Sequence, residues 1–151
     1  MLIEIIGLLF SMIVGTIGHF IYDWSDKNKL IGFLFATNES VWQHLKLGIT
    51  PIILWTIIEL LTFNFNNLFF TKFFSIISFI IVLLSLYYIY KYFSKKNILF
   101  LDILIFYISL AISYYVSIKL LFSLDSSFIF NFIGIFGIFF ILFCYKILNK
   151  Y

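Results

Sequence analysis

The sequence is short of charged residues. Ten lysines and seven acidic residues make up 11% of its 151 residues, and no arginine is present. A soluble domain usually carries about 25% charged residues, so this chain has too few to cover a globular surface with polar groups. The shortage excludes an ordinary soluble enzyme, a disordered tail and a nucleic-acid-binding protein. An integral membrane protein remains, and the length predicts a single transmembrane domain over residues 1–151.

Cysteine and proline are also scarce, with one of each in the chain. Cys144 has no second cysteine with which it could form an intrachain disulfide. Apolar residues, in contrast, make up 64% of the sequence, and 22 residues are phenylalanine. Because aromatic rings mostly pack in a core or face lipid, we assign the phenylalanine excess to the membrane environment and not to a stacked ligand.

Five apolar stretches reach the length of about 20 residues that a membrane-spanning helix needs. They are Leu2–Tyr22, Leu45–Phe65, Phe70–Phe93, Ile98–Leu124 and Phe128–Leu148. Their apolar runs are continuous and lack the alternation of a membrane β-strand. The sequence therefore predicts an all-α, polytopic membrane helix bundle with about five transmembrane helices and membrane lipids as its surroundings. Short links make successive helices antiparallel neighbours.

The lysines predict how the bundle is oriented. Two of the ten, Lys72 and Lys119, fall on one side of the membrane. The other eight fall on the opposite side: Lys27, Lys29, Lys46, Lys91, Lys95, Lys96, Lys146 and Lys150. By the positive-inside rule, we expect a multi-pass protein of the bacterial cytoplasmic membrane with its N-terminus outside and its C-terminus cytoplasmic. Glu4 stands where a signal peptide would be basic, so the first stretch is expected to remain as a helix.

The link between the first two spans is long and unusual. A charged patch is followed by seven apolar residues, 30–36, which are too few to cross a membrane. Backbone at membrane depth is tolerated only where protein or water satisfies its polar groups. We therefore expect the link to be partly buried or re-entrant.

The next helix is predicted to begin near residue 39 and to continue through the second span. Ser40 and Gln43 have the spacing of a capping box. Thr50-Pro51 could instead open a new helix. Residues 51–65 alone, however, would extend only about 22 Å, which is too short to cross a membrane. This favours one continuous helix that contains Pro51.

Two strings in this region are similar to a known family. They are GHFIYDW at residues 18–24 and NESVWQHLK at residues 38–46, and Pro51 and Glu59 follow them. The chain resembles an uncharacterised family of small bacterial membrane proteins, a domain of unknown function whose motif reads N-E-S-V-W-E-H-L-K. Gln43 departs from the glutamate of that motif. The resemblance covers about the first 60 residues. It implies several membrane helices and supplies no reaction.

Several ionisable residues lie at the predicted cytoplasmic side. His19 and Asp23, and likewise Ser40 and His44, are four residues apart and share a helix face. Two imidazoles with a carboxylate are typical zinc ligands, and an open position on the ion would activate water. The sequence thus offers a divalent metal site at His19, Asp23 and His44, with Asp102 or Glu39 as a further ligand or base. Glu39 and His44 are about 140° apart on a straight helix, so both could bind one ion only if the helix begins irregularly.

Two other interpretations of these residues stay open. The histidines and carboxylates could form a hydrogen-bonded network that ties the link to the helix ends, with no metal. Ser40, His44 and Asp23 could form a hydrolytic relay, although no glycine-rich nucleophile turn surrounds the serine. Asp102 and Glu59 also count as polar residues inside spans, and Glu59 could be a protonated carboxyl between helices, a proton or cation relay, or a ligand.

A stripe of small residues runs along the first helix and allows another helix to approach closely. It consists of Gly7, Ser11, Gly15 and Gly18. Packing within the chain is one use of it, and a protein partner or a homodimer is the other. Three functional classes follow from the sequence as a whole. They are a binding or accessory membrane protein, a metal-assisted intramembrane hydrolase of a lipid-like substrate, and a small transporter or channel that uses Glu59.

Overall fold

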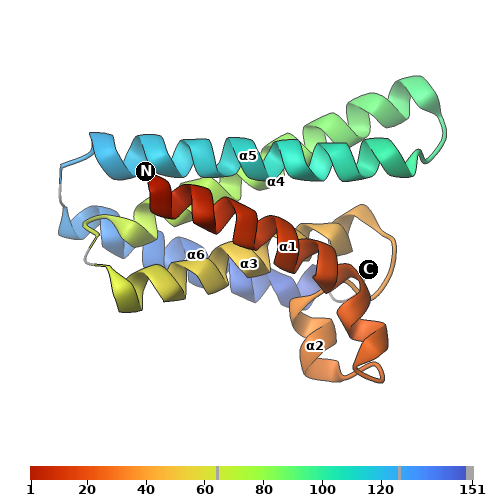
Figure 1. The fold of residues 1–151 in the computed structure, drawn as a ribbon, viewed down its shortest axis with the longest axis horizontal. Coiled ribbons are helices and arrows are strands. Elements are labelled where there is room, and N and C mark those ends of the chain that lie inside the picture. Colours follow the sequence, from red (N-terminus) through yellow and green to blue (C-terminus); the bar gives the residue numbers. More distant parts are fainter. Residues whose placement is uncertain (64, 126, 149–151) are drawn as a thin grey trace.

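The computed structural model describes residues 1–63, 65–125 and 127–148, and these contain six helices and no strand (Figure 1). The helices are α1 (Leu2–Trp24), α2 (Lys29–Leu34), α3 (Val41–Thr62), α4 (Leu68–Ser94), α5 (Leu99–Ser123) and α6 (Phe128–Leu148). All except α2 are long and apolar enough to cross a membrane. The predicted all-α bundle with five spans is therefore confirmed. Lys150, one of the lysines that predicted the orientation, lies outside the described residues.

Successive long helices run in opposite directions (Figure 1). They are not all neighbours, because α6 packs on α4, which runs in the same direction, and not on α5. α4 packs mainly on α5 and α6, and α1 packs on α3 and α5. α3 is the most deeply buried span. The apolar core lies between α3, α4 and α5 and includes Ile52, Ile76, Phe79 and Leu110, which are almost fully covered. The loop from α4 to α5 lies at the same end of the bundle as α2 and the start of α3 (Figure 1).

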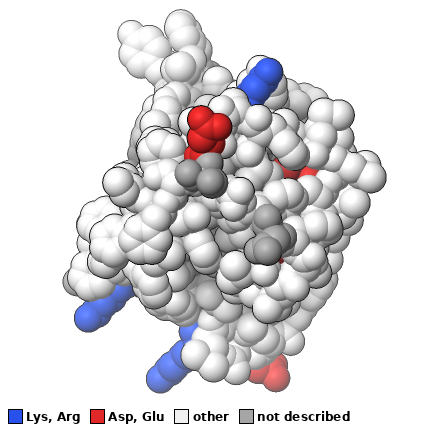
Figure 2. Space-filling model, turned by 90° about the vertical axis from the view of Figure 1, so that its left-hand side faces the viewer, with Lys and Arg blue, Asp and Glu red and all other residues white. Residues whose placement is uncertain are grey.

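The outer surface is largely apolar, as expected of helices that face lipid. Large hydrophobic side chains such as Ile13 on α1, Ile112 on α5 and Phe136 on α6 are exposed. Figure 2 shows one end of the molecule, where a few charged side chains lie among many uncharged ones. The exposed apolar side chains along the sides of the five long helices are the kind of surface that such helices present to hydrocarbon.

The link between α1 and α3 is partly buried, as predicted. It contains α2, whose first turn is capped by the side chain of Asn28. The Nζ atom of Lys46 donates a hydrogen bond of 2.7 Å to the carbonyl oxygen of Gly32. Thr50 Oγ1 donates one of 2.5 Å to the carbonyl oxygen of Leu34. These bonds from α3 satisfy backbone groups of the link and hold it against the bundle.

α3 is one continuous helix with Pro51 inside it, as the length argument predicted. Ser40 is its N-cap residue, and its Oγ accepts a hydrogen bond of 3.3 Å from the backbone N–H of Gln43. The second hydrogen bond of a capping box would run from the N–H of Ser40 to the side chain of Gln43. Gln43 Oε1 accepts from the N–H of Thr37 at 3.4 Å, and the N–H of Ser40 donates to Asn38 Oδ1 instead. The turn before α3 is thereby fixed by side chains.

The small-residue stripe of α1 is covered by the chain's own helices. Gly7, Ser11, Gly15 and Gly18 are all buried. A Cβ atom at Gly7 would lie 2.2 Å from Nε1 of Trp55, and one at Gly18 would lie 2.4 Å from the ring of Phe35. The Oγ of Ser11 is 2.7 Å from the hydroxyl of Tyr114. The stripe brings α1 close to α3, and this places the end of α1 beside the start of α3.

Candidate functional site

Three ionisable side chains meet where α1 ends and α3 begins. His19 comes from the end of α1, Glu39 from the turn before α3, and His44 from the start of α3. Glu39 Oε1 is 3.3 Å from Nε2 of His19, and Glu39 Oε2 is 3.8 Å from Nε2 of His44. One ligand atom of each lies within 4.8 Å of the other two. Among the described residues, no other three His, Cys, Asp or Glu side chains approach in this way.

The local structure before α3 explains why Glu39 joins this group. α3 begins at Val41, and Ser40 has an extended backbone conformation. Glu39 is therefore outside the helix and is not held to the spacing of about 140° that a straight helix would impose. Its side chain is 82% exposed, so water reaches the group from this side. Glu39 and His44 could bind one ion only if the helix began irregularly, and the structure shows such a start.

The orientation of His44 turns its Nε2 toward Glu39, where this nitrogen could bind an ion. Its Nδ1 is 2.8 Å from the backbone carbonyl oxygen of Ser40. A carbonyl oxygen only accepts, so Nδ1 carries the hydrogen and Nε2 of the neutral ring carries a lone pair. Metal-binding histidines almost always donate their second N–H to a carbonyl or carboxylate group in this way. The two imidazole rings lie with their centroids 5.3 Å apart.

The other residues that sequence analysis proposed lie in different places. Asp23 does not belong to the group of converging ligand atoms. The hydroxyl of Ser40 caps α3, and His44 bonds the carbonyl oxygen of Ser40 and not its hydroxyl, so a Ser40–His44–Asp23 relay is not assembled. Asp102 lies in the first turn of α5 and accepts a hydrogen bond from the hydroxyl of Tyr90.

A cavity of about 610 Å³ adjoins the histidines. His19, Glu39, His44 and Asp102 all line it, so the structure brings four of the six candidate residues to one space. Its remaining walls come mainly from apolar side chains of α1, α3, α4 and α5. The arrangement is thus a polar cluster at the edge of a largely apolar chamber, which is the usual composition of a ligand-binding site.

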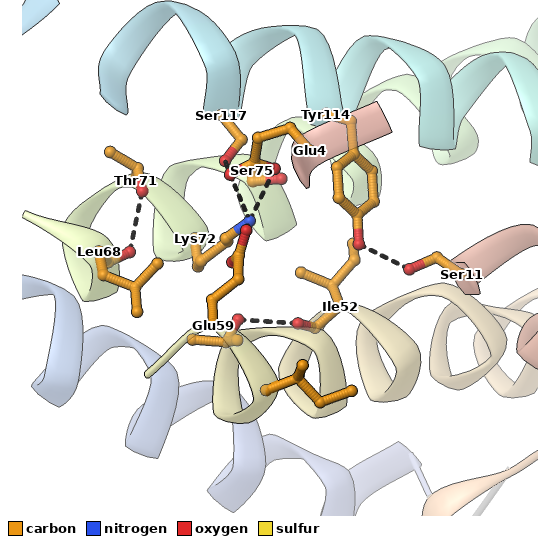
Figure 3. A network of polar contacts seen from close by, with 12 residues as sticks. Glu4, Ser11, Ile52, Glu59, Leu68, Thr71, Lys72, Ser75, Tyr114 and Ser117 are labelled. Atoms are coloured by element: carbon orange, nitrogen blue, oxygen red, sulfur yellow. Dashed lines mark hydrogen bonds and ion pairs between the residues drawn. The ribbon is translucent and has the colours of Figure 1, made fainter. Parts of the chain in front are cut away.

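A second polar cluster, which the sequence did not predict, lies inside the bundle (Figure 3). Lys72 Nζ is 2.7 Å from both carboxylate oxygens of Glu4 and 2.7 Å from Oε2 of Glu59. All three side chains are fully buried. Ser117 Oγ also donates to Glu4 Oε1 at 3.1 Å. We call Glu4, Lys72 and Glu59 the buried ion triad. It connects α1, α3 and α4, and Ser117 adds α5.

The buried ion triad changes how two residues are interpreted. The lysine distribution assigns Lys72 to the outer side, and the sequence leaves the partner of Glu59 open. Glu59 lies in the last turn of α3, which ends at Thr62. It is paired with Lys72 and does not line the cavity. The signal in the sequence was an ionisable residue inside each of three apolar runs, because such residues in spans generally pair with one another.

One of three comparisons with known proteins identifies a family for the chain. No curated protein and no solved structure matches the chain. A family model does match, and it covers residues 2–150, far beyond the first 60 residues that carry the motif. The chain therefore belongs to the family of unknown function DUF6512.

Proposed function

We propose that this protein is a metal-binding membrane protein that holds a divalent ion of the zinc type at His19, Glu39 and His44. The observation that carries the proposal is the convergence of their ligand atoms within 4.8 Å from separate segments of the chain. Zinc is bound by histidine nitrogen and carboxylate oxygen, usually with four ligands in total. Three protein ligands leave the fourth position to water or to another molecule, as in catalytic zinc sites.

The distribution of the lysines supports one assignment of the two membrane sides. Under the positive-inside rule, the end of the bundle that carries the α4–α5 loop, with its Lys95 and Lys96, is cytoplasmic. The metal site is at this same end (Figure 1). We therefore infer that the site faces the cytoplasm of a bacterial cell and that the N-terminus is outside.

Metal analysis of the purified protein tests the proposal. We expect one zinc ion per chain in the wild type after dialysis, and a loss of zinc affinity in His19→Ala and His44→Ala. Mutation of a residue that only supports a ligand typically lowers metal affinity about 10–100-fold. Removal of the ligand itself should lower zinc affinity at least as much, so we expect a decrease of roughly a hundredfold. Isothermal titration with zinc measures the change.

Asp23→Asn is the matched control. Asp23 lies one helical turn beyond His19 but outside the group of converging atoms, so this variant should bind zinc as the wild type does. A wild-type protein without stoichiometric zinc would overturn the proposal, and so would zinc binding that both histidine variants retain.

A hydrolytic reaction is a second candidate, and the position of Asp102 favours it. Asp102 lines the same cavity as the metal ligands, where its carboxylate could act as a general base for a metal-bound water. In that case Asp102→Asn should lower zinc-dependent hydrolysis of a 4-nitrophenyl ester by about 10²–10⁴-fold while zinc affinity stays unchanged. Equal rates of ester hydrolysis for the wild type and Asp102→Asn would exclude Asp102 as the general base. So would hydrolysis no faster than that by free zinc.

A further inference from the structure

The cavity beside the metal ligands is large enough for an organic molecule. Its volume of about 610 Å³ is within the range of about 300–1,000 Å³ that small-molecule sites occupy. A water molecule takes up only about 30 Å³, so a hydrated ion would fill a small part of the space. Leu47, Leu83 and Ile105 form part of its walls and are themselves buried. The space next to the ion is therefore suited to a hydrocarbon group.

The rim of the cavity has an apolar part and a polar part. Phe20 on α1 and Leu99 and Ile103 on α5 line the cavity and are also exposed. Because α1 and α5 are membrane-spanning candidates, these side chains open the cavity toward the surface that contacts hydrocarbon. Glu39 lines the cavity too and is exposed on the polar side. A molecule that fits this rim has a hydrocarbon part and a polar head.

The charge of the proposed metal site selects the kind of head group. A divalent cation bound by two neutral imidazoles and one carboxylate keeps one net positive charge. Asp102 also lines the cavity, and its carboxylate accepts a hydrogen bond from the hydroxyl of Tyr90. The positive charge of the ion itself still favours an oxygen anion at the fourth position, and carboxylate oxygen is an ordinary zinc ligand. The cavity has the volume of a site for one drug-sized ligand, which suits a single hydrocarbon chain better than a whole two-chain phospholipid.

We propose that the cavity binds a long-chain carboxylate, with its head group on the metal held by His19, Glu39 and His44 and its chain between α1 and α5. This inference rests on the proposed metal site and names the ligand of that site. The chain would enter past Phe20 and Ile103 and lie against the buried apolar wall, while the head stays on the side of the exposed Glu39.

Electron paramagnetic resonance of spin-labelled stearic acid tests this inference. The full-length protein is placed in phosphatidylcholine nanodiscs, because detergent would itself occupy an amphiphile site. The spectrum separates stearate held by the protein from stearate that moves freely in the lipid. We expect zinc to increase the immobilised fraction about tenfold over samples with EDTA. The spin-labelled methyl ester, which has no anionic head, should not respond to zinc.

Two tryptophan variants on α5 localise the binding. Ile103→Trp narrows the rim and should abolish the zinc-dependent immobilised fraction. Ile108→Trp is the matched control, because Ile108 is exposed on the same helix and does not line the cavity. It should behave as the wild type. Zinc titration of both variants should give unchanged zinc affinity, since neither residue is a ligand.

The outcomes separate this inference from the proposed metal site. Zinc binding without zinc-dependent immobilisation of stearate would overturn the carboxylate site and leave the metal site standing. Absence of zinc binding would overturn both. Equal effects of Ile103→Trp and Ile108→Trp would show that stearate contacts only the outer surface. Displacement of the label by hexadecyl phosphate and not by palmitate would overturn the assignment of a carboxylate head.

Discussion

Replacement of Lys72 by methionine is expected to destabilise the bundle by about 3–5 kcal/mol, the usual cost of removing one partner of a buried ion pair. Among the described residues, Lys72 is the one cation that pairs with both Glu4 and Glu59, at 2.7 Å from each. Without it, two carboxylates would remain fully buried with no counter-charge. The free energy of unfolding, measured by titration of mixed micelles with a denaturing detergent, gives the size of the effect.

The matched control is Lys119→Met. Lys119 is exposed near the end of α5, at a distance of 5.4 Å from its Nζ to the ring of Tyr115. Loss of such an exposed cation should change the free energy of unfolding by no more than about 0.5 kcal/mol. A Lys72→Met protein that is as stable as this control would show that the buried ion triad does not hold the helices together.

A triple variant shows whether unpaired charge or lost packing causes the loss of stability in Lys72→Met. Glu4→Gln, Lys72→Met and Glu59→Gln together remove all three ionisable groups and keep the side-chain volumes similar. Replacement of a complete buried ion group by uncharged residues is often neutral or stabilising, so we expect the triple variant to recover most of the stability lost in Lys72→Met. If the triple variant is as unstable as the single one, lost packing around Lys72 is the cause and not unpaired charge.

The spans could be predicted because their signal is carried by the local sequence. Hydropathy alone set the approximate limits of five helices, and the length of the segment after Pro51 showed that this proline lies inside α3. The partly buried link followed in the same way, because seven apolar residues cannot cross a membrane. Each of these properties depends on residues that are close together in the chain.

The site could be predicted only in part, because helix positions give depth and not direction around the bundle. His19 and His44 were expected at the same depth, and the structure brings them together. Asp23 was placed with them by its helix face, whereas Glu39 takes that position because Ser40 ends the regular backbone before α3. The buried ion triad depends on pairing between Lys72 and Glu4, 68 residues apart, and no local pattern specifies such a contact.

The contact of α6 with α4 gives the second large expected effect. Gly134→Ala should lower the free energy of unfolding by about 1–3 kcal/mol, the cost of overpacking a well-packed interface. A Cβ atom at Gly134 would lie 2.2 Å from the carbonyl carbon of Phe69 and from the backbone nitrogen of Phe70. These are backbone atoms at the start of α4, so they cannot rotate away, and α6 would have to move outward.

Gly137→Ala is the matched comparison, one helical turn further along α6. The added Cβ atom there would lie 2.4 Å from the ring of Phe73, which is a side chain that can turn aside. We therefore expect a smaller loss of stability, partly offset by the gain of roughly 0.5–1 kcal/mol that alanine has over glycine within a helix. Thermal unfolding of the two variants in the same detergent measures the difference. If Gly137→Ala is the more damaging change, the close approach of the α4 backbone is not what requires glycine at position 134.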